Sequence, residues 1–326
     1  MIWVTWAQHR REALVSGIIL TVAAALLVLT GLIMLADFQS SGAASCAPAG
    51  GPAVGVFNAG TSCEPVLGAF FGRWFSLTQT AWLALMTLPV LLGVFIAAPL
   101  LSREFEQRTY LFAWSQSITS LRWAVVKLGL FVTVVLVSAA ALTVLVMWWH
   151  APLDLAGHDG PWAAFDIQGL APIGYAVFAL SLGTLAGLVI RRTIPAMALT
   201  LFVFVAVRIL IGALVRPHFM AAVTGSALNV KQGSWLLSTN YYADAQGQHL
   251  SAEQVNQMVS VYASTAPKSF NGSTVMDYLQ QHGISLLTDY QPPDRFWTFQ
   301  LIETAVFVAL AVVLVGASLW WLQRKA

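Results

Sequence analysis

Six long apolar runs dominate the sequence and constrain its fold more than any other feature. Each is close to the roughly 20 residues that an α-helix needs to cross about 30 Å of hydrocarbon. The fourth run is the shortest, and the fifth and sixth each contain one charged residue, Arg208 and Glu303, which is rare within a span. The pattern predicts an all-α polytopic membrane protein with six transmembrane helices, at residues 13–36, 79–101, 124–149, 173–190, 196–215 and 296–321.

The composition supports the membrane class. Hydrophobic residues make up 58% of the 326 residues and charged residues 9%, whereas an ordinary soluble domain has about 25% charged residues. The mean hydropathy is +0.74. The net charge is only +2, and the basic residues are scattered along the chain, which argues against a nucleic-acid partner.

The positions of the basic residues predict how the spans are oriented, because cytoplasmic loops are enriched in Lys and Arg. A cytoplasmic N-terminus places ten of the sixteen basic residues on the cytoplasmic side and most acidic residues on the other side. Both termini are therefore expected in the cytoplasm. The ten residues are Arg10, Arg11, Arg103, Arg108, Arg122, Lys127, Arg191, Arg192, Arg324 and Lys325.

Residues 1–12 precede the first span and are predicted to form a short interfacial elbow helix. As a helix, they would place Ile2, Trp3, Trp6 and Arg10 on one side, a pattern typical of a segment that lies along the inner leaflet. A signal peptide is the alternative, but the apolar run that follows is far longer than the apolar region of such peptides.

The loop predicted outside the membrane at residues 37–78 contains both cysteines of the chain, Cys46 and Cys63. Extracytoplasmic compartments are oxidising, so the pair is expected to form a disulfide. In the chain-entropy model this bond would stabilise the folded state by about 3 kcal/mol. Two free thiols and a lipid-modified Cys46 are the alternatives.

A second exterior segment, residues 217–295, is polar enough to fold in water. Ser251 and Gln254 have the spacing of a capping box at the start of a helix. A second short helix is expected over residues 274–281. We therefore predict a small helical extracellular cap, which separates the first five spans, in residues 13–216, from the sixth span and cytoplasmic tail, in residues 296–326.

The sequence has none of the common catalytic signatures. It contains no G-x-x-x-x-G-K-[ST] phosphate loop, no G-x-S-x-G, no H-E-x-x-H and no C-x-x-C pair. The stretch HAPLDLAGHD, residues 150–159, fits no strong metal-ligand spacing, so its histidines are interpreted as solvated loop residues. We expect a non-catalytic chain with no metal or cofactor of its own.

The connection between the second and third spans, Ser102–Trp123, is the longest charged stretch in the first two hundred residues. The sequence REFEQRTYLFAWSQSITSLRWAVVKLG, residues 103–129, resembles the segment of ABC type-2 exporter permeases that connects to the ATPase. The usual Gly before the Thr is replaced by Arg108, and the usual Pro is replaced within Ser117–Thr119. The resemblance implies ATPase coupling through Glu104, Glu106, Arg108, Thr109 and Arg122, with Lys127 at the second basic position.

A second stretch, YQPPDRFWTFQLIE at Tyr290–Glu303, looks like the entry to the last span in actinobacterial members of the same family. The layout of the chain also matches the family's half-transporters. The resemblance implies a permease in a bacterial plasma membrane, paired with a second copy or a paralogue and surrounded by membrane lipid. A separate cytoplasmic ATPase subunit would bind the ATP and Mg.

The charges within the spans predict a contact between helices. Arg208 lies eight residues before Arg216, about 12 Å below the outer boundary, and Glu303 lies six residues after Trp297, about 9 Å below it. Intramembrane ions usually pair with one another or line a wet cavity. We predict an Arg208–Glu303 pair between the fifth and sixth spans near the outer gate, with a substrate contact as the alternative.

The resemblance also implies a transport pathway, because the second and fifth helices of two copies line a central cavity in this family. The corresponding residues are Thr87, Phe95, Phe202 and Phe204. An apolar lining favours a hydrophobic drug, natural product or lipid. Two other functions are the alternatives. One is a membrane sensor that binds a ligand through its cap, and the other is a secondary carrier, which the absence of broken-helix patterns disfavours.

Overall fold

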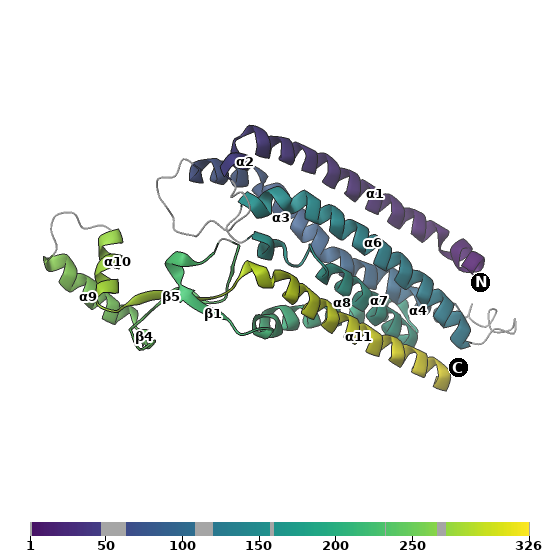
Figure 1. Ribbon diagram of the computed structural model, residues 1–326. Coiled ribbons are helices and arrows are strands. Elements are labelled where there is room, and N and C mark those ends of the chain that lie inside the picture. Colours follow the sequence, from purple (N-terminus) through teal and green to yellow (C-terminus); the bar gives the residue numbers. More distant parts are fainter. Residues whose placement is uncertain are drawn as a thin grey trace.

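The computed structural model describes residues 2–46, 63–107, 120–156, 160–231, 233–265 and 272–325. It contains a bundle of long helices, with both chain ends at one end of the bundle (Figure 1). A smaller domain projects from the opposite end. We call these two ends the terminal side and the cap side.

The described residues include six helical segments that are long and apolar enough to cross a membrane, as predicted. Each of the six segments overlaps one of the predicted apolar runs. The helices of the bundle are α1 (Ile2–Ser40), α3 (Glu64–Leu92), α4 (Ala98–Glu106), α6 (Ser120–Ala156), α7 (Ala171–Ile190), α8 (Thr193–Leu210) and α11 (Phe296–Lys325).

Two of the predicted boundaries are wrong because helices extend beyond the apolar runs. Residues 2–12 continue into the first span as one uninterrupted helix, α1, so the predicted elbow is not a separate element. The first helix breaker in the chain is Gly17, which explains the continuity. Most of the predicted outer loop at residues 37–78 is also helical, because α3 begins at Glu64 with Pro65 in its first turn, where proline is favoured.

The second span consists of three consecutive helical segments. A π-helical turn, Gly93–Ala97, joins α3 to α4. Pro89, inside α3, lacks the N–H needed for a regular helical hydrogen bond. Such π-turns within α-helices are found mostly at functional positions, and this one faces the central helix of the bundle, α7.

The central helix is α7. In its membrane-spanning stretch 72% of the residues are buried, against 17% in those of α1, α6 and α8. It packs against α3, α4, α6, α8 and α11. Close approach depends on glycine: a Cβ at Gly187 would collide with the carbonyl oxygen of Ala98, and one at Gly183 would lie 2.5 Å from the carbonyl oxygen of Gly93.

Cys46 and Cys63 form the predicted disulfide. Cys46 ends the short helix α2 (Ala43–Cys46), and Cys63 directly precedes α3. The bond thus joins the cap-side ends of the first two spans. Nearby, Asp37 accepts hydrogen bonds from the side chains of Arg73 and Trp74, which tie α1 to α3.

The cap is an α/β domain, so it has strands in addition to the helices of the predicted small helical cap. The two predicted helices are present as α9 (Ala252–Thr265) and α10 (Gly272–Gln281), but a five-stranded antiparallel sheet accompanies them. The strands are two to seven residues long, and β5 pairs with residues more than forty positions away in β1, β2 and β3, which leaves little local sequence signal. They are β1 (Val223–Ser226), β2 (Trp235–Leu236), β3 (Tyr241–Ala243), β4 (His249–Leu250) and β5 (Ser285–Gln291).

The sheet has β5 at its centre, paired with β1, β2 and β3, while β4 extends it beyond β3. Val255, Leu279 and Ile284 form the buried centre of a separate cap core. An aromatic cluster attaches the cap to the bundle: the ring of Trp162, which precedes α7, stacks on Trp235 of β2 with 5.4 Å between centroids.

Candidate functional site

The cap side of the bundle contains a buried group of ionic side chains where the cap joins the spans. We define the ionic cluster as Asp166, Tyr175, Arg208, Arg216 and Glu303. Asp166 lies in the loop before α7, Tyr175 lies on α7, Arg208 on α8 and Glu303 on α11. The two chain segments that lead to the cap therefore meet within this cluster.

A second π-helical turn brings both arginines into the cluster. Residues eight apart on a regular α-helix, at 3.6 residues per turn, are rotated by about 80° from one another. The turn at Ile211–Val215 lies between Arg208 and Arg216, and its wider i→i+5 bonding reduces the rotation per residue. Both side chains consequently reach the same carboxylates.

Arg216 makes the closest contacts. Its Nε lies 2.6 Å from Oε2 of Glu303, and its Nη2 lies 2.8 Å from Oε1 of the same carboxylate. Nη2 also donates to Oδ1 of Asp166 at 2.5 Å. This two-point geometry is the strongest form of arginine–carboxylate pairing.

Arg208 is bound more loosely. Its Nη2 lies 3.1 Å from Oδ1 of Asp166, and its Nη1 lies 3.4 Å from Oε1 of Glu303. The guanidinium is centred 3.7 Å from the ring of Tyr175, whose hydroxyl donates to Glu303 at 2.6 Å. The structure therefore brings Arg208 and Glu303 together, but as two members of a larger group.

The cluster contains two positive and two negative side chains, so its formal charges balance. Glu303 is fully buried, with 0% of its side chain exposed, and Arg208 and Arg216 are 9% and 11% exposed. Burial raises the pKa of the Asp166 carboxyl, but the charges of Arg216 and Arg208 outweigh burial and hold that pKa below its usual value. Asp166 thus stays ionised at neutral pH, and the four charges satisfy one another.

Sequence reasoning missed three members of the cluster. Arg216 marked the outer boundary, Asp166 was counted only among the acidic residues outside the cytoplasm, and Tyr175 was not considered. The sequence contained one indication that Arg216 joins the cluster: Arg208 and Arg216 lie about two helical turns apart, next to the cap. Nothing local to Asp166 indicated that its loop folds back against the spans.

On the terminal side, α4 is joined to its neighbours by two acidic residues that we predicted as ATPase contacts. Glu104 accepts a hydrogen bond from Lys127 of α6 at 2.5 Å, and Lys127 also donates to the carbonyl of Leu100. Glu106 accepts hydrogen bonds from both the backbone N–H and the hydroxyl of Thr193, at 3.2 and 2.7 Å. We call these contacts the terminal junction, which connects α4 to α6 and to the first residue of α8.

Of the other predicted coupling residues, the structure describes only Arg122. Arg122 lies in the first turn of α6 and is exposed. Arg108 and Thr109 lie outside the described residues. The described part of the predicted coupling segment therefore consists of an internal junction with an exposed basic residue beside it.

The four predicted cavity residues do not share one environment. Phe204 is buried, 4% exposed, and stacks on Phe178 of α7. Phe95 and Phe202 are 60% and 74% exposed, and the hydroxyl of Thr87 is bonded to the backbone of its own helix. Within one chain, these residues do not enclose a pathway.

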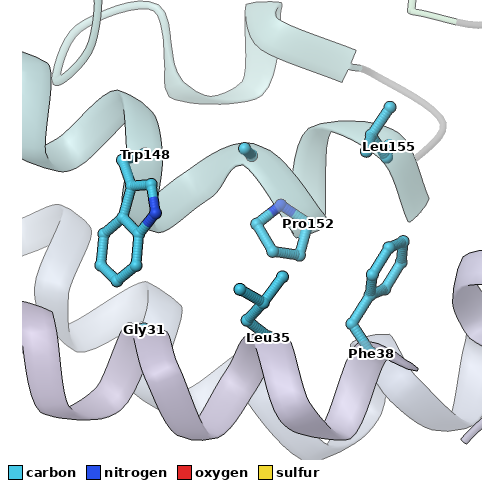
Figure 2. Close-up of a pocket in the computed structure, with 7 residues that line it drawn as sticks. Gly31, Leu35, Phe38, Trp148, Pro152 and Leu155 are labelled. Carbon is cyan, nitrogen blue, oxygen red and sulfur yellow. The ribbon is translucent and has the colours of Figure 1, made fainter. Parts of the chain in front are cut away.

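An apolar groove of about 150 Å³ lies elsewhere, between α1 and α6 near the cap side (Figure 2). The side chains of Leu35, Phe38, Pro152 and Leu155 border it in Figure 2, with Trp148 over Gly31. Neither helix supplies any of the residues predicted to line a substrate cavity.

The described residues contain no group of three or more His, Cys, Asp or Glu arranged to hold a metal ion. His150, one of the histidines in the stretch considered above, is buried and bonded to Asp154 of the same helix at 2.8 Å. Its interpretation as a solvated loop histidine is therefore wrong: α6 extends to Ala156 and includes it.

The six spans and their buried ionic contacts define a multi-pass membrane protein. The family model described as ABC-2 membrane transporter related matches residues 17–216. The chain belongs to this family of transporter permease subunits, whose members are membrane components associated with an ABC ATPase. No curated protein and no solved structure matches the chain.

Proposed function

We propose that this chain is the permease subunit of an ATP-driven exporter of hydrophobic compounds, driven by a separate cytoplasmic ATPase. The observation that carries the proposal, beyond the family, is the terminal junction. A partner can move spans only through an element that is fixed to them, and α4 is fixed to α6 through Lys127 and to α8 through Thr193. A force applied at the segment after α4 would act on three spans together.

The orientation supports the same reading. The terminal side has the exposed basic residues Arg103, Arg122, Arg192 and Arg324, and basic residues favour the cytoplasmic face. The terminal side would then face the ATPase, and the cap would lie outside the cell.

The exposed apolar faces support an export pathway that requires a second permease chain. Phe95 on the second span and Phe202 on α8 are both more than half exposed, while the interior of the single bundle is filled by α7. A second copy or a paralogue packed against these faces would enclose an apolar path, which suits a hydrophobic drug, natural product or lipid.

The experiment that tests the proposal has two readouts. The chain is extracted from its native membrane in mild detergent, and co-purifying proteins are identified; inverted vesicles are then assayed for ATP-dependent accumulation of hydrophobic dyes. We expect an ABC ATPase to co-purify. Arg122→Glu should reduce its recovery, whereas Arg324→Glu, on the same side but on α11, should not. Extraction of a folded chain without any ATPase would contradict the proposal.

A sensor is the second candidate function, because the cap has its own core and both of its stems enter the ionic cluster. A ligand bound to the cap would act directly on α8 and α11. Vesicles that contain the chain and its ATPase but accumulate no dye, while cap ligands change ATP hydrolysis, would favour the sensor over the exporter.

A further inference from the structure

The apolar groove between α1 and α6 (Figure 2) is built from one face of each helix. Its lining residues are spaced three or four positions apart, which places them side by side on a helix surface. All of them are apolar apart from the indole N–H of a tryptophan. We define the α1–α6 groove by these residues, which are Gly31, Leu35 and Phe38 on α1, and Trp148, Ala151, Pro152 and Leu155 on α6.

Contacts at both ends of the groove fix its shape. At the end nearer the terminal side, the ring of Trp148 lies so close to Gly31 that a Cβ there would come within 2.6 Å of it. Next to this contact, Trp149 donates a hydrogen bond to Thr30 at 3.1 Å. At the cap-side end, the ring of Phe38 is centred 5.3 Å from an aromatic ring on α3. The groove is therefore a preformed feature of the protein.

The groove lies at the depth of the hydrocarbon, in the membrane leaflet on the cap side. Its two helices contain the candidate membrane spans Leu14–Ser40 and Val125–Ala156, and the groove falls within the last three helical turns of each. Gln39 and Ser40, which follow Phe38, are exposed. A molecule in the groove would thus meet apolar side chains along its length and polar groups at its cap-side end.

The groove is open to the surroundings of the protein. Trp148 and Leu155, on its α6 side, are 40% and 48% exposed. One helical turn further toward the terminal side, Val28 on α1 and Val144 on α6 are also exposed. The apolar surface along the seam between the two helices is therefore longer than the groove itself.

We propose that the α1–α6 groove is a binding site for one acyl chain of a phospholipid from the cap-side leaflet, with the headgroup at the level of Gln39. The proposal does not rest on the proposed function, because it requires only that the spans lie in a membrane. The helix α1 packs mainly against α6. A bound chain would therefore fill the seam by which α1 is attached to the bundle.

The size of the groove favours a single hydrocarbon chain over a helix of another protein. A helix with its side chains is about 10–12 Å across, whereas an apolar space of about 150 Å³ suits a molecule of about the size of benzene. A helix packed over the groove would leave it empty, and the lining side chains would lack van der Waals partners. A chain of methylene groups can enter the groove and follow the apolar surface beyond it.

Packing, rather than the hydrophobic effect, would hold the chain. Lipid tails elsewhere in the membrane are as apolar as the groove, so no apolar surface leaves water when the chain binds. A chain in a concave groove contacts protein on several sides, whereas a chain on a convex helix face contacts it on one side. Lipid should therefore occupy the groove for longer than it occupies the rest of the lipid-facing surface.

The test uses the full-length chain in phosphatidylcholine liposomes that include a phosphatidylcholine with a photoreactive diazirine on its acyl chain. Crosslinked residues are identified by mass spectrometry after illumination. The reference is Ile33, which is 62% exposed and lies on another face of α1, two residues from Leu35. Ala151→Phe fills the groove, and the matched control Ala36→Phe adds the same ring to an exposed position of α1 that does not line the groove.

We expect at least fivefold more crosslinking in the groove than at Ile33 in wild type. Ala151→Phe should reduce this ratio to about one, and Ala36→Phe should leave it unchanged. Leu35→Phe, on the opposite wall, is a second filling variant for the case that Ala151→Phe does not fold, which thermal unfolding detects. A ratio of one in wild type, or a wild-type ratio in a folded filling variant, would overturn the proposal.

A second arm tests whether the acyl chain or the headgroup is recognised. The liposomes and the photoreactive lipid are both changed from phosphatidylcholine to phosphatidylglycerol. An acyl-chain site predicts the same ratio in both lipids. A ratio above one with only one of the headgroups would overturn the proposal.

A third arm tests for a second copy of the chain in the groove. Both native cysteines form the disulfide, so Leu155→Cys adds a single thiol at the edge of the groove, and Ile33→Cys is its control. We expect oxidation in liposomes to join no more copies through Leu155→Cys than through Ile33→Cys. Efficient dimer formation through Leu155→Cys alone would show that another copy covers the groove, and would overturn the proposal.

Discussion

The ionic cluster on the cap side and the terminal junction both use charged side chains to join helices, but they differ in burial and in the number of partners. In the cluster, Glu303 has no exposed side-chain surface and is bonded to Tyr175 and both arginines. In the junction, Glu106 is exposed and bonded to Thr193. The other pair of the junction, Glu104 and Lys127, is 13% and 3% exposed. One end of the bundle is thus held by a single network of mutually dependent charges, and the other by two separate contacts, one buried and one exposed.

This difference indicates how the two ends respond to a partner. A buried charge is strongly destabilised when its partner is removed, because no water replaces the lost contact. An exposed charge exchanges its protein contact for water or another protein at little cost. The cap side is therefore suited to keeping its geometry, whereas the exposed Glu106–Thr193 contact of the terminal junction can be exchanged at little cost.

The largest effect is expected for Glu303→Gln. The change leaves two buried arginines with Asp166 as their remaining acidic partner, so the free energy of unfolding should fall by about 3–5 kcal/mol. Thermal unfolding in detergent measures this loss. Glu253→Gln, on an exposed position of α9, is the control and should not change the midpoint. A midpoint for Glu303→Gln equal to wild type would mean that the cluster does not hold the cap side.

The next effect concerns the disulfide. Cys46→Ser with Cys63→Ser removes a cross-link over a separation of 17 residues, which should lower stability by about 3 kcal/mol in the chain-entropy model. A reducing agent should lower the unfolding midpoint of wild type to that of the double variant and leave the variant unchanged. A wild-type protein that does not respond to reduction would contradict the expected contribution.

A smaller loss is expected for Glu104→Gln at the terminal junction. Lys127, with 3% of its side chain exposed, keeps its bond to the carbonyl of Leu100 but loses its charged partner, at a cost of about 2 kcal/mol. Glu104→Asp preserves the charge and should recover part of the loss. If Glu104→Gln destabilised the chain as much as Glu303→Gln, the contrast between the two ends would be wrong.

The smallest effect on stability is expected for Glu106→Gln. The side chain is exposed, so the amide oxygen of the introduced Gln can still accept one hydrogen bond from Thr193. Water can replace the other hydrogen bond. The unfolding midpoint should decrease less than for Glu104→Gln. Thr193→Val, which removes the hydroxyl and keeps the backbone N–H, should produce a comparable decrease, and a double variant no worse than either single change would assign both losses to the same contact.

The transmembrane architecture was predictable because burial in lipid imposes a length and an apolarity on each span. The ends of the helices were less predictable. The segment before Ala13 contains no Gly or Pro, and after Pro65 the stretch up to Thr78 contains only Gly68 and Gly72 as weak breakers. Both α1 and α3 therefore extend beyond the hydropathy limits. The strands of the cap were missed because four of them are only two to four residues long and their common partner, β5, is distant in sequence from β1, β2 and β3.

The site was predictable only in part, for a related reason. An isolated charge in an apolar run is conspicuous, so Arg208 and Glu303 were identified from the sequence. Arg216 lies at the end of an apolar run and Asp166 in the loop before one, where charges are ordinary. Their participation depends on the π-turn at Ile211–Val215 and on a loop that folds inward. Glu104 and Glu106 were predicted as ATPase contacts from the family resemblance. Their bonds within the chain were not predictable, because their partners, Lys127 and Thr193, lie 23 and 87 residues away.

The pairing of Arg216 with Glu303 has a consequence for how such a chain can evolve. The family match ends at residue 216, where the segment leading to the cap begins, and Glu303 lies just after that segment returns. Both ends of the segment that forms the cap are thus anchored to the bundle. The entropic cost of closing a loop between two fixed ends rises only slowly with the length of the loop. Insertions, deletions and exchange of whole modules are therefore tolerated between these positions more readily than anywhere within the spans.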